Sequence, residues 1–193
     1  TLFPLYGMEK TDVRRLAEEH GLVNSHKPDS QDICFVPDGD YVSFIERYTG
    51  YKPVSGEYVF SDGKRAGEHS GIINYTIGQR KGLGVTFGKP VFVTDKDPLS
   101  NTVTLGDEAE LFHRTLFLRD FNLIIADKLS EPMRVTAKSR YSAKEQSALL
   151  YPAENGIVRI EFDDPVRAPA KGQACVVYDG DIVVGGGVIA RVE

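Results

Sequence analysis

A cysteine stands inside the short apolar run ICFV, residues 33–36, with polar residues on both sides. A cysteine in such a run is most often a small hydrophobic residue of a core. However, the run is only four residues long, follows Asp32 closely and connects two expected helices, a position where functional residues concentrate. Cys34 is therefore either a buried hydrophobic residue or a reactive thiol, and the residues around it leave both interpretations open.

Chemistry at Cys34 requires the thiolate form, because the thiolate is the nucleophile. The nearest basic residues are His26 and Lys27, seven or eight positions earlier, so activation cannot be derived from the sequence. A cysteine hydrolase is the weakest alternative, since no triad motif accompanies the histidines His20, His26, His69 and His113. The second cysteine, Cys175, lies in the strand-like run ACVVYD and is expected to be structural.

The segment GEHSGIINYTIGQRKGLG, residues 67–84, combines five glycines with two basic residues and a histidine. The backbone N–H groups of a glycine-rich loop can cradle phosphate. The segment is not a nucleotide P-loop, because it lacks the GK[ST] ending and a preceding buried strand. Its glycines can equally serve tight turns and close strand packing, so both roles remain open.

The stretch RVTAKSRYSAKEQ, residues 134–146, has four basic residues and no acidic one up to Lys144. If this stretch is a strand, alternate residues share a face. One face then has the side chains of Arg134, Thr136, Lys138 and Arg140, and the opposite face has those of Val135, Ala137, Ser139 and Tyr141. The basic face is either a solvated surface or a surface for an RNA backbone. Tyr141 is either a base-stacking residue or, as strict alternation favours, a core residue.

The bulk composition is that of an ordinary globular protein, with 41% hydrophobic and 26% charged residues and a formal net charge of -5. The two cysteines form no disulfide or metal-site pattern, which favours a reducing, cytoplasmic setting. No HExxH, GxSxG or dinucleotide-binding motif occurs, and no apolar run is long enough to span a bilayer. We expect no metal, and neither a membrane nor DNA as a partner.

Two helices are expected, both near the start of the chain. Thr11 is the predicted N-cap of the first, whose apolar positions follow helical spacing and whose end is marked by Gly21 and Leu22. The second should start near Asp40 and end before Gly50. It should carry one apolar face, composed of Tyr41, Phe44, Ile45 and Tyr48.

From Pro53 onward, short β-rich runs alternate with turn residues, as in the three predicted hairpins at 90–107, 147–165 and 174–186. This pattern favours antiparallel barrels or sandwiches. We therefore predict a mainly β fold with a short α-helical N-terminal part. The expected division is a helical segment with the cysteine loop at 1–52, a small central β domain at 53–113, and an antiparallel β-barrel at 114–193.

These stretches together resemble the C-terminal two-thirds of bacterial tRNA-specific 2-thiouridylases, enzymes that replace the 2-oxygen of the wobble uridine by sulfur. FPLYGMEKTDVRRLAEEHGL resembles the helix after the family's nucleotide-binding domain, and DSQDICFVPDGDY resembles its cysteine motif. The glycine-rich segment and the ending FDDPVRAPAKGQACVVYDGDIVVGGG match as well. The resemblance runs from end to end, and the long glycine-rich segment is highly specific to the family.

The resemblance implies roles for several residues. Cys34 corresponds to the family cysteine that accepts sulfur as a persulfide from a sulfur-relay donor protein. Arg140, Tyr141 and Gln173 correspond to positions that contact tRNA, and the basic strand adds Lys138 and Arg134 as candidates. The implied reaction transfers the persulfide sulfur to C2 of the ATP-activated wobble uridine.

The resemblance further implies that an ATP pyrophosphatase domain, with an SGGxDS phosphate-binding loop, a second cysteine and a catalytic Asp, precedes this sequence in the complete enzyme. ATP with Mg²⁺ is then expected in that domain and no cofactor in this part, which alone should be inactive. A non-catalytic tRNA-binding β-barrel module is the alternative function.

Overall fold

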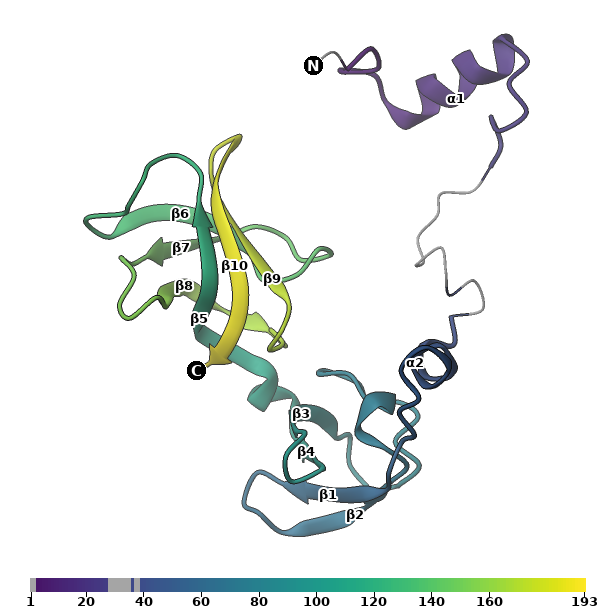
Figure 1. Ribbon diagram of the computed structural model, residues 1–193, viewed down its shortest axis with the longest axis vertical. Helices are drawn as coiled ribbons and strands as arrows, with labels where there is room; N and C mark the ends of the chain where they lie inside the picture. Colours follow the sequence, from purple (N-terminus) through teal and green to yellow (C-terminus); the bar gives the residue numbers. More distant parts are fainter. Residues whose placement is uncertain (1–2, 28–35, 37–38) are drawn as a thin grey trace. The chain divides into compact units, whose positions relative to one another are not determined.

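The computed structural model describes residues 3–27, 36 and 39–193. The chain divides into two compact units, Thr1–Tyr51 and Lys52–Glu193. The described residues form two α-helices, two short 3-10 helices and ten strands, which confirms the predicted mainly β fold (Figure 1). No described helix combines the length and the apolar character that crossing a membrane requires.

Helix α1, Lys10–Glu19, begins before its predicted cap. The N-cap is Glu9 and not Thr11, because the backbone N–H groups of Asp12 and Val13 already donate to the Glu9 carbonyl, both at 3.0 Å. The predicted ending is confirmed: Gly21 has a φ of 64°, and the N–H of Leu22 donates to the Ala17 carbonyl at 2.9 Å. This bond closes the helix as a Schellman motif.

Helix α2, Tyr41–Thr49, has the predicted ends. The side chain of Asp40 accepts a hydrogen bond from the Ser43 N–H at 3.0 Å. Hydrogen bonding from the Ser43 side chain, and then from its N–H, holds the pKa of the Asp40 carboxyl below its usual value. Gly50 ends the helix with a φ of 71°. The rings of Phe44 and Tyr48 stack with centroids 5.7 Å apart, as neighbours on one helix face do.

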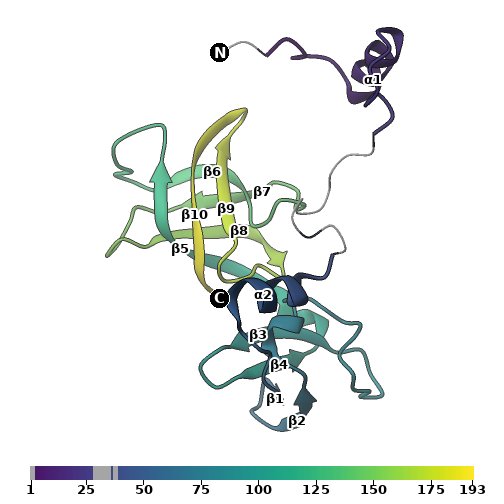
Figure 2. The same ribbon diagram turned by 45° about the vertical axis from the view of Figure 1, so that its right-hand side comes forward.

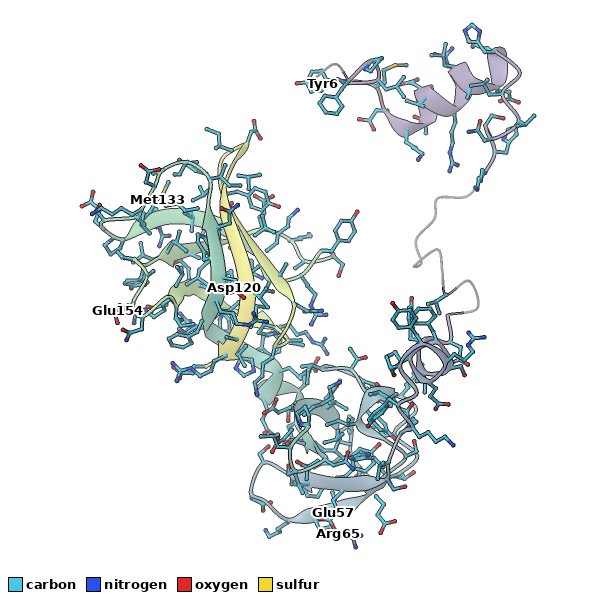
Figure 3. All side chains as sticks on the ribbon, in the orientation of Figure 1. Tyr6, Glu57, Arg65, Asp120, Met133 and Glu154 are labelled. Carbon is cyan, nitrogen blue, oxygen red and sulfur yellow. The ribbon has the colours of Figure 1, made fainter. Side chains whose placement is uncertain are left out.

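A four-stranded sheet in the order β2-β1-β4-β3 forms the first half of the second unit. Tyr58 and Val93 are fully buried in its core, and Glu57 on β1 forms an ion pair with Arg65 on β2 at 2.8 Å (Figure 3). Strand β1 pairs in parallel with β4, a long-range pairing that the expected antiparallel pattern did not include. The strands are β1 Gly56–Phe60, β2 Arg65–His69, β3 Phe92–Asp97 and β4 Thr102–Gly106.

The rest of this unit is a closed barrel in the order β10-β5-β8-β7-β6-β9, in which every neighbouring pair is antiparallel (Figure 2). The predicted hairpins β3–β4, β7–β8 and β9–β10 are all present. Alternate residues, including Leu116, Ile160 and Val177, fill the interior. The strands are β5 Phe112–Leu123, β6 Met133–Lys138, β7 Gln146–Leu150, β8 Val158–Arg167, β9 Ala174–Asp179 and β10 Ile182–Val192.

A run of three glycines, residues 185–187, lets β10 approach β5 closely enough to close the barrel. A Cβ atom on Gly187 would lie 2.9 Å from the carbonyl oxygen of Arg119. The β10–β5 register also shifts between Gly186 and Val188, so the strand bends at this point. Bulges and glycines at such bends are a common means of closing barrels.

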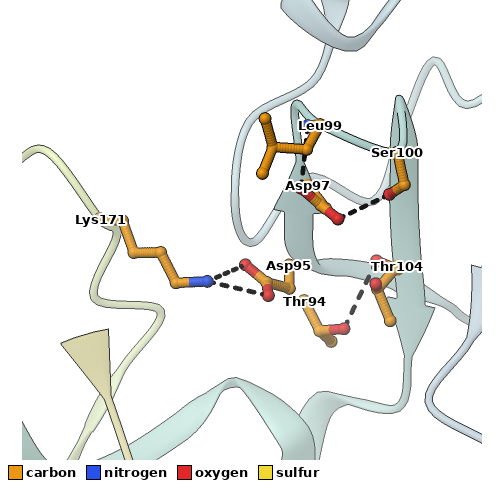
Figure 4. A network of polar contacts seen from close by, with 7 residues as sticks. All are labelled: Thr94, Asp95, Asp97, Leu99, Ser100, Thr104 and Lys171. Carbon is orange, nitrogen blue, oxygen red and sulfur yellow. Dashed lines mark hydrogen bonds and ion pairs between the residues drawn. The ribbon is translucent and has the colours of Figure 1, made fainter. Parts of the chain in front are cut away.

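An ion pair connects the small sheet to the barrel. The Lys171 ammonium, in the β8–β9 connection, lies 2.9 and 3.0 Å from the two carboxylate oxygens of Asp95 on β3 (Figure 4). Strand β5 follows the sheet after the short helix η2, Glu108–Leu111. The three-part division at residues 52 and 113 stays a proposal, because the compact units separate only at Tyr51.

Replacing Gly187 by alanine should destabilise the barrel by about 1–3 kcal/mol, because the added methyl group meets backbone atoms of β5 that cannot move independently. Thermal unfolding followed by circular dichroism measures the change. Ala174→Val is the control, since it adds atoms at an exposed position of β9 and should leave the melting temperature nearly unchanged. Equal melting temperatures for Gly187→Ala and the unmodified chain would contradict this account of barrel closure.

Candidate functional site

The predicted catalytic residue Cys34 and its neighbour Asp32 lie outside the described residues. The other cysteine, Cys175, is fully buried on β9 among the apolar side chains of the barrel core. Burial raises the pKa of the Cys175 thiol to about 12, so the thiol stays protonated near neutral pH. Cys175 is accordingly an inert core residue, as its sequence context indicated.

The glycine-rich segment 67–84 is a structural element of the small sheet. Its five glycines all have positive φ angles, which serve turns. The Gly71 N–H donates to the His69 ring at 3.1 Å, and the Gly78 N–H donates to the Val93 carbonyl at 2.8 Å. These two N–H groups therefore stabilise the protein itself, which favours the structural alternative over a backbone phosphate cradle.

His69 is the centre of a buried aromatic cluster with Tyr58 and Tyr75, whose rings meet edge to face at 5.5–5.6 Å. Its Nε2 donates to the Asn101 carbonyl at 3.1 Å, and its Nδ1 accepts the Gly71 N–H. Both ring nitrogens are thus engaged within a site closed to solvent. His69 is therefore a structural histidine and not a partner for a reactive cysteine.

The basic face of strand β6 is paired with carboxylates from other parts of the barrel. The Arg134 guanidinium donates two bonds to Asp163 on β8, at 2.9 and 2.5 Å, and this pairing lowers the pKa of Asp163. The Lys138 ammonium lies 3.6 Å from a carboxylate oxygen of Glu145. Sequence inspection missed the Asp163 pairing because that carboxylate is 29 residues away along the chain.

Arg140 follows the end of β6 and is half-buried. Its guanidinium donates to the carbonyl oxygen of Ala168, in the connection between β8 and β9. Its Nε atom is buried without a hydrogen-bond partner among the described residues. The bond to the Ala168 carbonyl therefore anchors the Arg140 guanidinium at this place on the barrel.

Tyr141 is fully exposed, so the expectation that it points into the barrel core is wrong. Strand β6 ends at Lys138, but burial still alternates through the buried Ser139 and the half-buried Arg140. The chain then turns, with the Ala143 N–H donating to the Arg140 carbonyl at 3.1 Å, and Tyr141 in this turn no longer follows the period-2 pattern. The phenol ring is consequently free to contact a ligand.

One end of the barrel gathers four of the five predicted RNA-contacting residues, Lys138, Arg140, Tyr141 and Gln173. The antiparallel register pairs Lys138 with Val176, so the chain after β6 lies beside the chain before β9, which contains the exposed Gln173. Arg134 lies toward the other end of β6. A hollow of about 370 Å³ opens at the first end, lined by Ala137, Ser139, Arg140, Ser142, Ala143, Lys144, Gln146, Val166 and Arg167.

Among the described residues, no group of three or more His, Cys, Asp or Glu side chains lies close enough together to hold a metal ion. The polar groups of this barrel end are mostly hydrogen-bond donors and cations. Such a surface is suited to phosphates and bases.

Three family models match successive parts of the chain. They are a tRNA methyl transferase HUP domain over residues 1–38, a tRNA methyl transferase PRC-barrel domain over 42–107, and an aminomethyltransferase beta-barrel domain over 113–189. The class that the fold and these matches define is that of tRNA-modification proteins.

The chain is homologous over nearly its whole length to proteins named tRNA-specific 2-thiouridylase. It is 54% identical to the tRNA-specific 2-thiouridylase MnmA of Acetivibrio thermocellus, over 97% of this chain and 52% of the relative. It is 49% identical to the MnmA protein of Clostridioides difficile, over 99% of this chain and 53% of the relative. It is 48% identical to the MnmA protein of Clostridium acetobutylicum, over 98% of this chain and 53% of the relative. The chain spans about half the length of these curated relatives.

In a Cys34→Ser variant, Cys175 is the one remaining thiol, and it should not react with a thiol reagent at about pH 8 in the folded protein, because it is buried and protonated. Reaction should become fast when denaturant unfolds the barrel. Mass spectrometry of the labelled protein follows both phases. Rapid labelling of Cys175 without denaturant would show that the thiol is accessible and contradict its assignment to the core.

Proposed function

We propose that this chain acts within a tRNA-uridine 2-sulfurtransferase, an enzyme that replaces the 2-oxygen of the wobble uridine of tRNA by sulfur. The observation that carries the proposal is the identity of about half of all residues to proteins named tRNA-specific 2-thiouridylase, over nearly the whole chain. The cysteine motif around Cys34 and the donor-rich barrel end supply the two parts that such a reaction needs.

Cys34 is the proposed sulfur carrier. It accepts a sulfur atom as a persulfide from a sulfur-relay donor protein and delivers it to C2 of the adenylated uridine, whose oxygen leaves as AMP. Attack of a second cysteine on the Cys34 sulfur frees the transferred sulfur, either as sulfide before it reaches C2 or from C2 after direct attack, and leaves the two cysteines joined in a disulfide. A thiol suits this role because sulfur transfer proceeds by thiolate attack and mixed disulfides. Cysteine also forms the covalent intermediates that such a transfer needs.

ATP, with Mg²⁺, supplies the activation of the uridine oxygen in the proposed complete enzyme. The residues of this chain do not fit a nucleotide site, because it has no P-loop or SGGxDS sequence and the N–H groups of Gly71 and Gly78 are bonded within the protein. We therefore assign ATP to a preceding pyrophosphatase domain. We also propose a cytoplasmic location, where tRNA is modified.

The barrel is proposed to hold the tRNA through Arg140, Tyr141 and Gln173, which lie at one barrel end. The exposed ring of Tyr141 is suited to stacking on an unpaired base, and Arg140 is suited to a phosphate or a base edge. Arg134 and Lys138 are assigned a weaker, long-range attraction, because each is paired with a carboxylate that offsets its charge.

The alternative is a non-catalytic module that only positions tRNA. The two functions differ in their need for Cys34, since a positioning module binds RNA through the barrel alone. The exposed Tyr141 and the donors beside it are compatible with both, so the decisive test is made at the cysteine.

Cys34→Ser, in the protein that also carries the pyrophosphatase domain, should abolish 2-thiouridine formation and leave the melting temperature unchanged. Liquid chromatography and mass spectrometry of digested tRNA measure the product. Cys175→Ser is the matched control: it should lower stability by about 1–3 kcal/mol, because a hydroxyl enters the core without a partner. It should retain 2-thiouridine formation. Full activity of Cys34→Ser would leave only the positioning function.

Tyr141→Ala should weaken tRNA binding by about 1–3 kcal/mol if the ring stacks on a base, with little change in the salt dependence. Arg140→Ala should reduce the slope of log affinity against log salt by about 0.7–0.9, because one phosphate contact is lost. Filter binding across a salt series separates the two effects.

Leu99→Ala, at an equally exposed apolar residue on the small sheet, is the control and should change neither quantity. If Tyr141→Ala and Arg140→Ala both bind tRNA like the control, this barrel end is not part of the interface.

A further inference from the structure

Residues 76–81 of the glycine-rich segment form a turn that is fixed from two sides. The Gln79 side chain accepts the Thr76 N–H at 2.9 Å and donates to the Lys81 carbonyl at 3.0 Å. Strand β3 holds the turn as well, because the Val93 N–H donates to the Gln79 carbonyl at 2.9 Å. A turn fixed in this way displays its next side chains, the exposed Arg80 and Lys81, at defined positions.

This turn packs against the barrel next to the candidate RNA site. A Cβ atom on Gly78, whose φ is +87°, would lie 3.2 Å from the Cβ of Ala168 and 3.8 Å from a guanidinium nitrogen of Arg167. Ala168 is the residue whose carbonyl binds Arg140. Arg80 is only two residues beyond Gly78, within about 8 Å along the chain, so its backbone is close to the barrel end.

The basic groups at this junction are largely without carboxylate partners. Among the residues that the structure describes, Arg80, Lys81 and Lys144 form no ion pair, and Arg167 has one carboxylate at 3.4 Å, from Glu108. Most other basic residues of the sheet and the barrel are paired, including Lys64, Arg65, Lys89, Arg119, Arg134, Lys138, Lys171 and Arg191.

A local excess of positive charge in a protein with a net charge of -5 is a feature that attracts polyanions. The cations lie on open surface and belong to different elements, the turn at 76–81, the β6–β7 loop and the end of β8. An extended chain of phosphates can contact all of them in sequence, whereas a small anion can contact only one part. The charge pattern therefore matches an RNA backbone better than a free nucleotide.

We propose that Arg80 and Lys81 form a phosphate-binding arm that extends the barrel's RNA site onto the small sheet, with Lys144 between the two. The RNA backbone then runs from the Tyr141 end of the barrel across the junction to the turn. This inference rests on the proposed function, because it assigns further contacts to the same tRNA. It gives the glycine-rich segment a role besides its structural one: Gly78 allows the turn to lie against Ala168.

The test is filter binding of tRNA to the chain with both residues replaced, Arg80→Gln and Lys81→Gln, across a salt series. Two lost phosphate contacts should reduce the slope of log affinity against log salt by about 1.4–1.8. If affinities converge at about 1 M salt, this slope difference corresponds to about 25- to 60-fold weaker binding at about 0.1 M. Circular dichroism melting should show unchanged folding, since both side chains are exposed.

Lys81→Gln and Lys128→Gln form the matched pair of single variants. Lys128 is an equally exposed lysine without an ion pair among the described residues, and it lies in the β5–β6 connection, toward the other end of β6. Lys81→Gln should reduce the slope by about 0.7–0.9, and Lys128→Gln should leave it unchanged. Equal slopes for the two variants would overturn the proposed arm.

The Tyr141→Ala variant separates this inference from the proposed function. If Tyr141→Ala weakens binding while the double variant binds like the unmodified chain, the arm is wrong and the barrel site stands. If the unmodified chain shows no salt-dependent tRNA binding, the proposed arm and the proposed barrel site are both wrong. Weakened binding in both variants supports the extended site.

Discussion

Ala168 is the residue on which the arrangement of the small sheet and the barrel depends. It is fully buried in the left-handed backbone region, with a φ of 51°, a conformation that costs a non-glycine residue roughly 1–2 kcal/mol. Its N–H donates to the Leu111 carbonyl at 2.6 Å, its methyl group faces Gly78, and its carbonyl accepts the Arg140 guanidinium. One strained residue thereby connects the end of the sheet, the glycine-rich turn and the candidate RNA site.

Further contacts support this junction and explain why it can act as a rigid platform. Phe92 and Leu111 pack with Ala168 in a small apolar cluster. The ion pair between Asp95 and Lys171 crosses the same boundary, although an exposed pair of this kind contributes little by itself. Apolar packing thus supplies most of the stability, while the polar contacts fix the orientation. A platform of this kind is suited to the proposed contact of one extended RNA with cations of both the sheet and the barrel.

Local features of the fold were predictable from the sequence, and long-range ones were not. The cap at Asp40 and the glycine at the end of α2 follow from residue type and spacing alone. The pairing of Arg134 with Asp163 joins distant segments, so strand alternation correctly placed Arg134 on an outer face but could not show that its charge is offset. Tyr141 was misplaced because the pattern says nothing about where a strand ends. The proposed role of Cys34 rests on the family resemblance, since activation of its thiol cannot be derived from the neighbouring sequence.

Lysine footprinting with and without tRNA tests most directly the central claim that the barrel end and the glycine-rich turn form one RNA surface. Acylation of the full chain, read by mass spectrometry, reports the exposure of each ammonium group. We expect that tRNA protects Lys81 and Lys144 and leaves Lys128 as reactive as in the free protein. Protection of Lys128, with Lys81 and Lys144 unchanged, would place the RNA toward the opposite end of the barrel and contradict the account.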